Sequence, residues 1–205
     1  PGPSPRGARR RRLPGTPRSG YGHAAPLEDL QEALRRVRAD DQWGLQAGSV
    51  GVVGFSAGGH LAACAMTLYD RPVNGSEIDC RPDFALLGYP VISLVDDRRH
   101  HGSRQALFGR QGDPELLALF SPNLQVTPYT PPAYIMHARD DDVVPYSNSV
   151  VMHEALLAQG VATELRLYES GGHGFGLGRP PHDSAAWPCA AADWLCRQGV
   201  TRRSS

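Results

Sequence analysis

Apolar side chains recur at helical spacing early in the chain. Intervals of three and four residues separate Leu27, Leu30, Leu34 and Val37. Such spacing places these side chains on one face of an amphipathic helix. A proline precedes them at position 26, where a helix tolerates it because the first turn needs no amide partner. The pattern therefore predicts a helix over residues 26–41.

Short apolar runs alternate with helical segments along the rest of the chain. Residues 49–55 read SVGVVGF, a β-branched run that is typical of a strand buried on both faces of a parallel sheet. A helix is expected directly after it, over AGGHLAACAMTL. Further strands are predicted at 84–87, 133–138 and 163–168, and further helices at 146–159 and 183–198. Strands separated by helices predict an α/β domain with a mainly parallel sheet.

The distribution of apolar residues also predicts the domain organisation. Residues 1–20 contain almost none and have no periodicity, so we expect a disordered basic tail there. For its arginine run, a solvated tail or a poorly defined N-terminus is favoured over a nucleic-acid or localisation patch. Residues 21–200 are expected to form one domain, because 205 residues suit a single core, and residues 201–205 a short tail. The long connection over 95–132, a loop with a short helix, is expected to cover or border a site.

Charge and composition narrow the class of partner. The chain has 21 basic and 21 acidic residues, which argues against binding to nucleic acid or to an anionic membrane. No apolar run approaches the roughly 18 residues that a membrane helix needs. The four cysteines lack the paired spacing of metal ligands, so no metal site is predicted. A small neutral substrate fits best, whereas the cell compartment and the oligomeric state stay open.

A G-x-S-x-G motif is the sharpest chemical signal. It runs from Gly54 through Phe55, Ser56 and Ala57 to Gly58, between a predicted strand and a predicted helix. This context is the one that a nucleophile elbow requires. The N–H of the residue after the serine would then donate to an oxyanion. The alternative is a structural serine in a glycine-rich turn.

Candidates for an acid and a base follow in the order that a Ser-Asp-His hydrolase needs. HARDDDVVP comes after the strand at 133–138, and GGHGFG comes after the strand at 163–168. Both segments therefore lie at the C-terminal ends of parallel strands, where α/β sheets carry their sites. His173, flanked by glycines, is the predicted base. Asp141 is the favoured acid, with Asp140 left open, and the remaining aspartates are expected to be solvated or to cap a helix.

The other histidines are not expected to act in catalysis. His60 falls inside the helix after the motif and points away from a general-base role. His100 and His101 are expected to be solvated loop residues, since no partner with metal-ligand spacing accompanies them.

Four segments together resemble a known family. GFSAGGHLAA, YPVISL, HARDDDVVPYSNS and GGHGFGLG are similar to the acetyl-esterase and acetyl-xylan-esterase-like branch of the α/β hydrolases, which is related to the prolyl-oligopeptidase-type serine hydrolases. The resemblance runs from about Tyr21 to the final helix. It implies a catalytic α/β-hydrolase domain without a cofactor, in which Ser56 is the nucleophile, Asp141 the acid and His173 the base.

The resemblance also implies roles for neighbouring residues and exposes one departure. Phe55 and Tyr89 are expected to contact substrate, with Pro90 near the same pocket. Family members carry a His-Gly-Gly-Gly-like loop and further strands upstream of the elbow, which this sequence does not show. We therefore expect a C-terminal portion of the fold, lacking N-terminal strands, with the elbow strand left as an exposed edge.

The predicted function is hydrolysis of a carboxylic ester, with a short acyl group such as acetate on a carbohydrate or similar small substrate. One alternative is a prolyl-oligopeptidase-type peptidase, which would need an N-terminal propeller. The other is an inactive fragment that acts at most as a binding module, because losing one oxyanion donor costs on the order of a hundredfold in rate.

Overall fold

Parallel strands form a single sheet in the computed structural model, which describes residues 23–39, 44, 50–70, 79–97, 100–109 and 112–201. The strands are β1 (Gly51–Phe55), β2 (Phe84–Gly88), β3 (Ala133–Ala138) and β4 (Thr163–Tyr168). They lie in the order β1-β2-β3-β4, each parallel to its neighbour. The predicted tail at 1–20 lies outside the described residues, as does the predicted tail at 201–205 except for Thr201.

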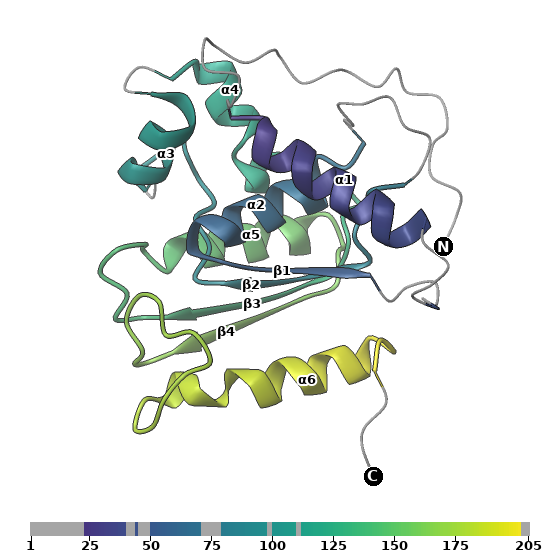
Figure 1. The fold of residues 1–205 in the computed structure, drawn as a ribbon. Coiled ribbons are helices and arrows are strands. Elements are labelled where there is room, and N and C mark those ends of the chain that lie inside the picture. Colours follow the sequence, from purple (N-terminus) through teal and green to yellow (C-terminus); the bar gives the residue numbers. More distant parts are fainter. Residues whose placement is uncertain are drawn as a thin grey trace.

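Helices cover both faces of the sheet (Figure 1). On one face lie α1 (Ala25–Ala39), α2 (Ser56–Thr67) and α5 (Ser147–Ala158), and on the other lies α6 (Trp187–Arg197). A short 3-10 turn, η3 (Asp183–Ala186), leads into α6. The long connection between β2 and β3 holds α3 (His101–Phe108), α4 (Pro114–Leu119) and the 3-10 turn η2 (Pro122–Leu124).

The predicted elements agree closely with the observed ones. The strands at 133–138 and 163–168 have the predicted bounds, whereas the elbow strand begins two residues later than predicted, at Gly51. The first helix starts one residue before the predicted proline and ends at Ala39. The last predicted helix divides into η3 and α6, because a proline occupies the first turn of α6 and suits a new helix start.

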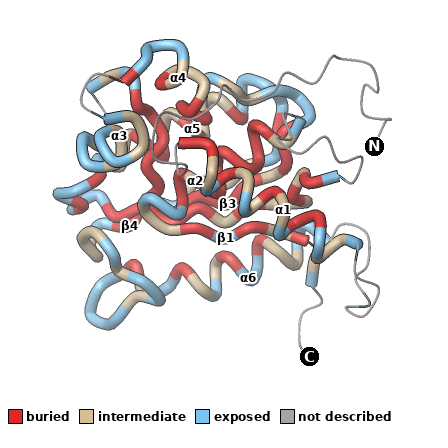
Figure 2. Tube along the Cα trace, turned by 45° about the horizontal axis from the view of Figure 1, so that its top comes forward, coloured by how far each residue is buried: buried red, intermediate tan, exposed pale blue. Residues whose placement is uncertain are grey.

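Burial explains why β3 is wholly apolar apart from one histidine. Every residue of AYIMHA in β3 is buried, as expected for a central strand covered on both faces. Tyr134 and Met136 pack with Trp187 and Trp194 against α6, while Ile135 joins the larger core under α2 and α5. Figure 2 shows this buried interior running through the sheet and α2.

Within the described residues, β1 pairs only with β2 and forms one edge of the sheet. Val53, in the middle of β1, is 58% exposed although it lies in a strand of apolar residues. The predicted exposed edge is thus confirmed for this part of the chain. No helix in the same part is both long and apolar enough to cross a membrane.

Candidate active site

A sharp bend joins β1 to α2 and carries Ser56 at its tip. Ser56 has a φ of +52°, a conformation that costs a non-glycine residue energy and is common where a strained turn presents a side chain. Glycines make the bend possible: a Cβ on Gly54 would overlap the carbonyl oxygen of Gly58, and a Cβ on Gly59 would lie 2.8 Å from Cβ of Pro90. The predicted strand-turn-helix context of the motif is therefore present.

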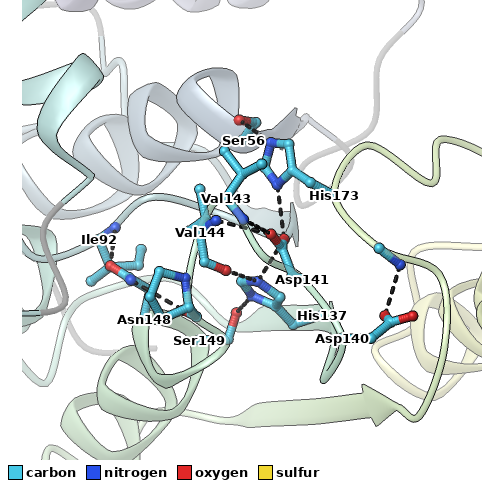
Figure 3. Close-up of polar contacts among 12 residues, drawn as sticks. Ser56, Ile92, His137, Asp140, Asp141, Val143, Val144, Asn148, Ser149 and His173 are labelled. Atoms are coloured by element: carbon cyan, nitrogen blue, oxygen red, sulfur yellow. Dashed lines mark hydrogen bonds and ion pairs between the residues drawn. The ribbon is translucent and has the colours of Figure 1, made fainter.

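Ser56 meets His173 across 117 residues of sequence (Figure 3). Its Oγ lies 2.9 Å from Nε2 of His173. The other ring nitrogen, Nδ1, lies 2.8 Å from Oδ2 of Asp141. The structure thus brings together the three residues that the sequence proposed, in one continuous chain of hydrogen bonds.

The Asp141 carboxylate is buried, and both of its oxygens accept hydrogen bonds. Its Oδ1 accepts the backbone N–H groups of Val143 and Val144, both at 2.9 Å, and its Oδ2 faces the rings of His173 and His137. Burial by itself raises the pKa of Asp141, but the hydrogen bonds from His137, Val144, His173 and Val143 outweigh burial and hold the pKa well below its usual range. The carboxylate is therefore an anion at neutral pH.

Asp140 has a different task from its neighbour. Its carboxylate is exposed and accepts the N–H groups of Gly171 at 3.2 Å and Gly172 at 2.7 Å, directly before His173. These bonds lower the pKa of Asp140, with the bond from Gly172 the largest cause. Asp140 thus ties the loop after β3 to the loop after β4, and the geometry favours Asp141 as the residue that contacts His173.

The loop that carries His173 is held at several points. Asp183 accepts the N–H groups of Glu169 and Ser170, both at 2.8 Å. Farther along, the carbonyl of Gly176 accepts the indole N–H of Trp187 at 2.7 Å. A glycine-rich loop would otherwise sample many conformations, so these anchors fix where the imidazole lies.

Tyr89 and Phe55 pack behind the histidine. The Tyr89 ring meets the edge of the His173 ring at a centroid distance of 5.1 Å, and its hydroxyl accepts the N–H of Gly176 at 3.3 Å. Tyr89 is only 5% exposed and has a positive φ of 35°. Phe55 packs between Tyr89 and Trp187, on the α6 side of the sheet. Tyr89 thus contacts the histidine directly and Phe55 contacts Tyr89, while the predicted contact of both with substrate stays a prediction.

An apolar cavity of about 510 Å³ adjoins the elbow on the side of α1 and α3. Its wall includes the first residues of α2, among them Ala57 and Gly58. The remaining described lining residues are His23, Pro26, Leu27, His60, Leu61, Cys64, His100, Gly102, Ser103, Ala106, Leu107 and Phe120. Ala57 is the second residue of α2, so its N–H is one of the helix-terminal donors that lack an intrahelical partner.

His60 and His100 make structural contacts. His60 is buried and its Nε2 lies 2.7 Å from the carbonyl oxygen of Phe120, which fits the prediction that it is no general base. The prediction for His100 was wrong: it is half-buried, and its Nδ1 accepts the N–H of Ser103 to cap α3. His101 is exposed, as predicted, but it is the first residue of α3 rather than a loop residue.

His137, the second imidazole on Asp141, was not predicted as a site residue from the sequence. Its side chain is fully buried, and Nε2 lies 3.1 Å from Oδ2 of Asp141. The signal that could have revealed it is a lone histidine in an otherwise apolar central strand, four residues before the acid. Among the described residues, no group of three or more side chains is arranged to hold a metal ion.

Known proteins are similar to this chain in sequence and in fold. A family profile named BD-FAE matches residues 21–156. The chain belongs to the BD-FAE family. An acetylxylan esterase from Xylanibacter ruminicola is 37% identical over 158 residues, which are 75% of this chain and 32% of the relative. An endo-1,4-beta-xylanase B from Butyrivibrio fibrisolvens is 31% identical over 157 residues, which are 74% of this chain and 25% of the relative.

Solved structures extend the comparison of this BD-FAE chain. The acetyl ester-xyloside bifunctional hydrolase from Caldicellulosiruptor lactoaceticus has a TM-score of 0.83 at 37% identity, covering 89% of this chain and 69% of that one. The carboxylesterase Cest-2923 from Lactobacillus plantarum has a TM-score of 0.71 at 27% identity, covering 87% and 69%. These relatives confirm the predicted α/β-hydrolase fold and the acetyl-xylan-esterase-like branch. The chain spans about a third or less of the length of the curated relatives it matches.

Proposed function

We propose that this protein hydrolyses carboxylic esters, with Ser56 as nucleophile, His173 as general base and Asp141 as the acid that orients the base. The observation that carries the proposal is the hydrogen-bonded chain from Ser56 Oγ through His173 to Asp141, with distances of 2.9 and 2.8 Å. Acyl transfer through such a triad needs no cofactor.

The direction of proton transfer follows from the Asp141 carboxylate. Because an anionic carboxylate faces Nδ1 of His173, that nitrogen carries the proton, and Nε2 is left to accept the hydroxyl proton of Ser56. Oγ can then attack an ester carbonyl while Asp141 stabilises the imidazolium. The imidazolium returns its proton to the departing alcohol, and water releases the acyl group by the same route in reverse.

Helix α2 supports the charge that develops on the carbonyl oxygen. The N-terminal end of a helix carries partial positive charge, and its first N–H groups are available as donors. We assign Ala57 N–H to the oxyanion because it directly follows the nucleophile. One such donor is worth on the order of a hundredfold in rate.

The substrate class that we propose is a short acyl ester, such as an acetyl group, on a carbohydrate or similar small alcohol. Two observations support it: the relatives include an acetylxylan esterase and an acetyl ester-xyloside hydrolase, and the described part of the chain has an open apolar cavity beside Ala57. The leaving oxygen must lie near Nε2 of His173, so the cavity, which His173 does not line, suits the acyl side.

Hydrolysis of p-nitrophenyl acetate and release of acetate from acetylated xylo-oligosaccharides test this proposal. We expect turnover by the wild type and a loss of about a million-fold in kcat for Ser56→Ala. Ser147→Ala, the same chemical change at the start of α5, is the matched control and should keep wild-type rates. Turnover of a proline-containing peptide but not of the esters would favour a peptidase, and no turnover of either would favour a binding module.

A further inference from the structure

The side chain of His137 is fully buried next to the site. It lies at the end of β3, and both ring nitrogens have close partners. Nδ1 lies 2.7 Å from Oγ of Ser149 on α5. Nε2 faces two acceptors, Oδ2 of Asp141 at 3.1 Å and the carbonyl oxygen of Val144 at 2.9 Å.

These partners determine where the proton of His137 lies. A carboxylate and a carbonyl oxygen can only accept, so Nε2 must carry the proton and donate to both. In the neutral ring, Nδ1 then accepts, and the hydroxyl of Ser149 donates to it. The result is a continuous line of hydrogen bonds that runs from Ser149 through His137 to Asp141 and on through His173 to Ser56 (Figure 3).

We propose that His137 is a positioning residue of this site: its Nε2–H orients the Asp141 carboxylate and weakens it as an acceptor for His173, while Ser149 holds the His137 ring. This inference rests on the proposed function. His137 touches neither Ser56 nor the described wall of the cavity, so it acts only through Asp141.

Both rings meet on the same carboxylate oxygen, which makes the effect direct. Oδ2 of Asp141 accepts from His137 and from His173, while Oδ1 is occupied by two backbone N–H groups. When the donor at His137 is removed, Oδ2 becomes a stronger acceptor for His173. A stronger acceptor holds the Nδ1 proton of His173 more tightly and so favours the imidazolium.

Few other ionisable groups face this pair in the described structure. The Tyr89 hydroxyl on the β2 side bonds to Gly176 rather than to the imidazole, and burial raises its pKa. Asp140 is directed to the backbone of the His173 loop. From α5, the contact is the uncharged Ser149. The acidic limb of the pH profile of kcat/KM should therefore depend on the hydrogen bonds that link His137, Asp141 and His173.

Two amide substitutions separate the two ends of the His137 ring. His137→Gln can place an N–H near the position of Nε2 and keep the donor to Asp141, whereas the shorter His137→Asn reaches only toward Ser149. The pH dependence of kcat/KM for p-nitrophenyl acetate is the measurement. For His137→Asn we expect the acidic limb to move to higher pH by up to about one unit, and kcat to fall about tenfold or more with KM within about twofold.

His137→Gln is expected to restore most of kcat and to keep the acidic limb close to the wild-type position. Ser149→Ala provides an independent variant if substitutions at 137 prevent folding. It frees the ring to rotate or change tautomer, so the limb should shift in the same direction by a smaller amount. Thermal unfolding of each variant checks that the compared proteins are folded.

The outcomes distinguish this inference from the proposed function. An unshifted acidic limb and unchanged kcat in His137→Asn overturn the inference, and so do equal changes in the Asn and Gln variants, which would indicate a packing role only. If these variants do not fold, an unchanged profile in Ser149→Ala overturns it. If the wild type neither turns over esters nor reacts with a fluorophosphonate, it is the proposed function that fails.

Discussion

At the scale of single residues, adjacent aspartates take on separate tasks because their side chains leave the chain in different directions. Asp141 is buried against His173, while Asp140 is exposed and bonds to the backbone before it. Consecutive carboxylates look equivalent in sequence. Only the course of the loop after β3 distinguishes them.

Substitution of each aspartate by asparagine tests this division. We expect Asp141→Asn to lower kcat by about ten-thousandfold, because an amide cannot stabilise the imidazolium and favours the wrong tautomer of His173. Asp140→Asn keeps a carbonyl oxygen that can accept from Gly172, so its kcat should stay within about tenfold of the wild type. Steady-state kinetics with p-nitrophenyl acetate measure both, and the reverse order would show that the acid is misassigned.

The sequence predicted some of these residues and not others for a physical reason. Ser56 and His173 lie in short glycine-rich motifs, and the glycines next to them in the sequence allow the local backbone conformation. The contacts of His137 with Ser149 and of Tyr89 with His173 join separate elements. Such contacts depend on how the elements pack against one another. A local sequence pattern in this chain does not predict that packing.

At the scale of elements, the elbow depends on how closely β1 approaches the start of α2. Gly54 lies in β1 where any Cβ would collide with the backbone of Gly58, whereas a Cβ on Gly58 itself would meet nothing within 4 Å. The close contact at the bend therefore requires a glycine at position 54 but not at position 58.

A pair of alanine substitutions tests that difference. Gly54→Ala should lower the free energy of unfolding by about 2 kcal/mol or more, because the strand and helix must move apart. Gly58→Ala should leave it within about 1 kcal/mol of the wild type, since alanine is the better helix former. Urea unfolding followed by the fluorescence of the three tryptophans, which include the buried Trp187 and Trp194, measures both. Equal losses would contradict the close contact between strand and helix backbones at the bend.

The element boundaries show where pattern reasoning succeeds. Strands β3 and β4 were predicted to the residue, because turn residues flank both the largely apolar run of β3 and the mixed polar and apolar run of β4. The connection before β3 was predicted as a long loop with a short helix, without bounds for that helix, and it holds two short helices and a 3-10 turn. Its helices α3 and α4 are short, and α3 has no buried residue, so they leave little periodic signal in the sequence.

At the scale of the whole molecule, the site lies at the C-terminal ends of the strands of the sheet. The segments that carry Ser56, Asp141 and His173 follow β1, β3 and β4, and parallel strands place their C-terminal ends together. The order of motifs in the sequence was therefore enough to predict the fold class. The conformation of the His173 loop was not predictable from the sequence: it brings the imidazole from the end of β4 past β3 and β2 to the elbow after β1.

The central claim is that Ser56 is a nucleophile activated by His173, and covalent labelling tests it most directly. After incubation with a fluorophosphonate, peptide mass mapping should locate one adduct on Ser56, and none should form in Ser56→Ala. His173→Gln should slow labelling by at least about a thousandfold, because the hydroxyl loses its base. An adduct on another residue, or labelling of Ser56 at the same rate without His173, would contradict the account.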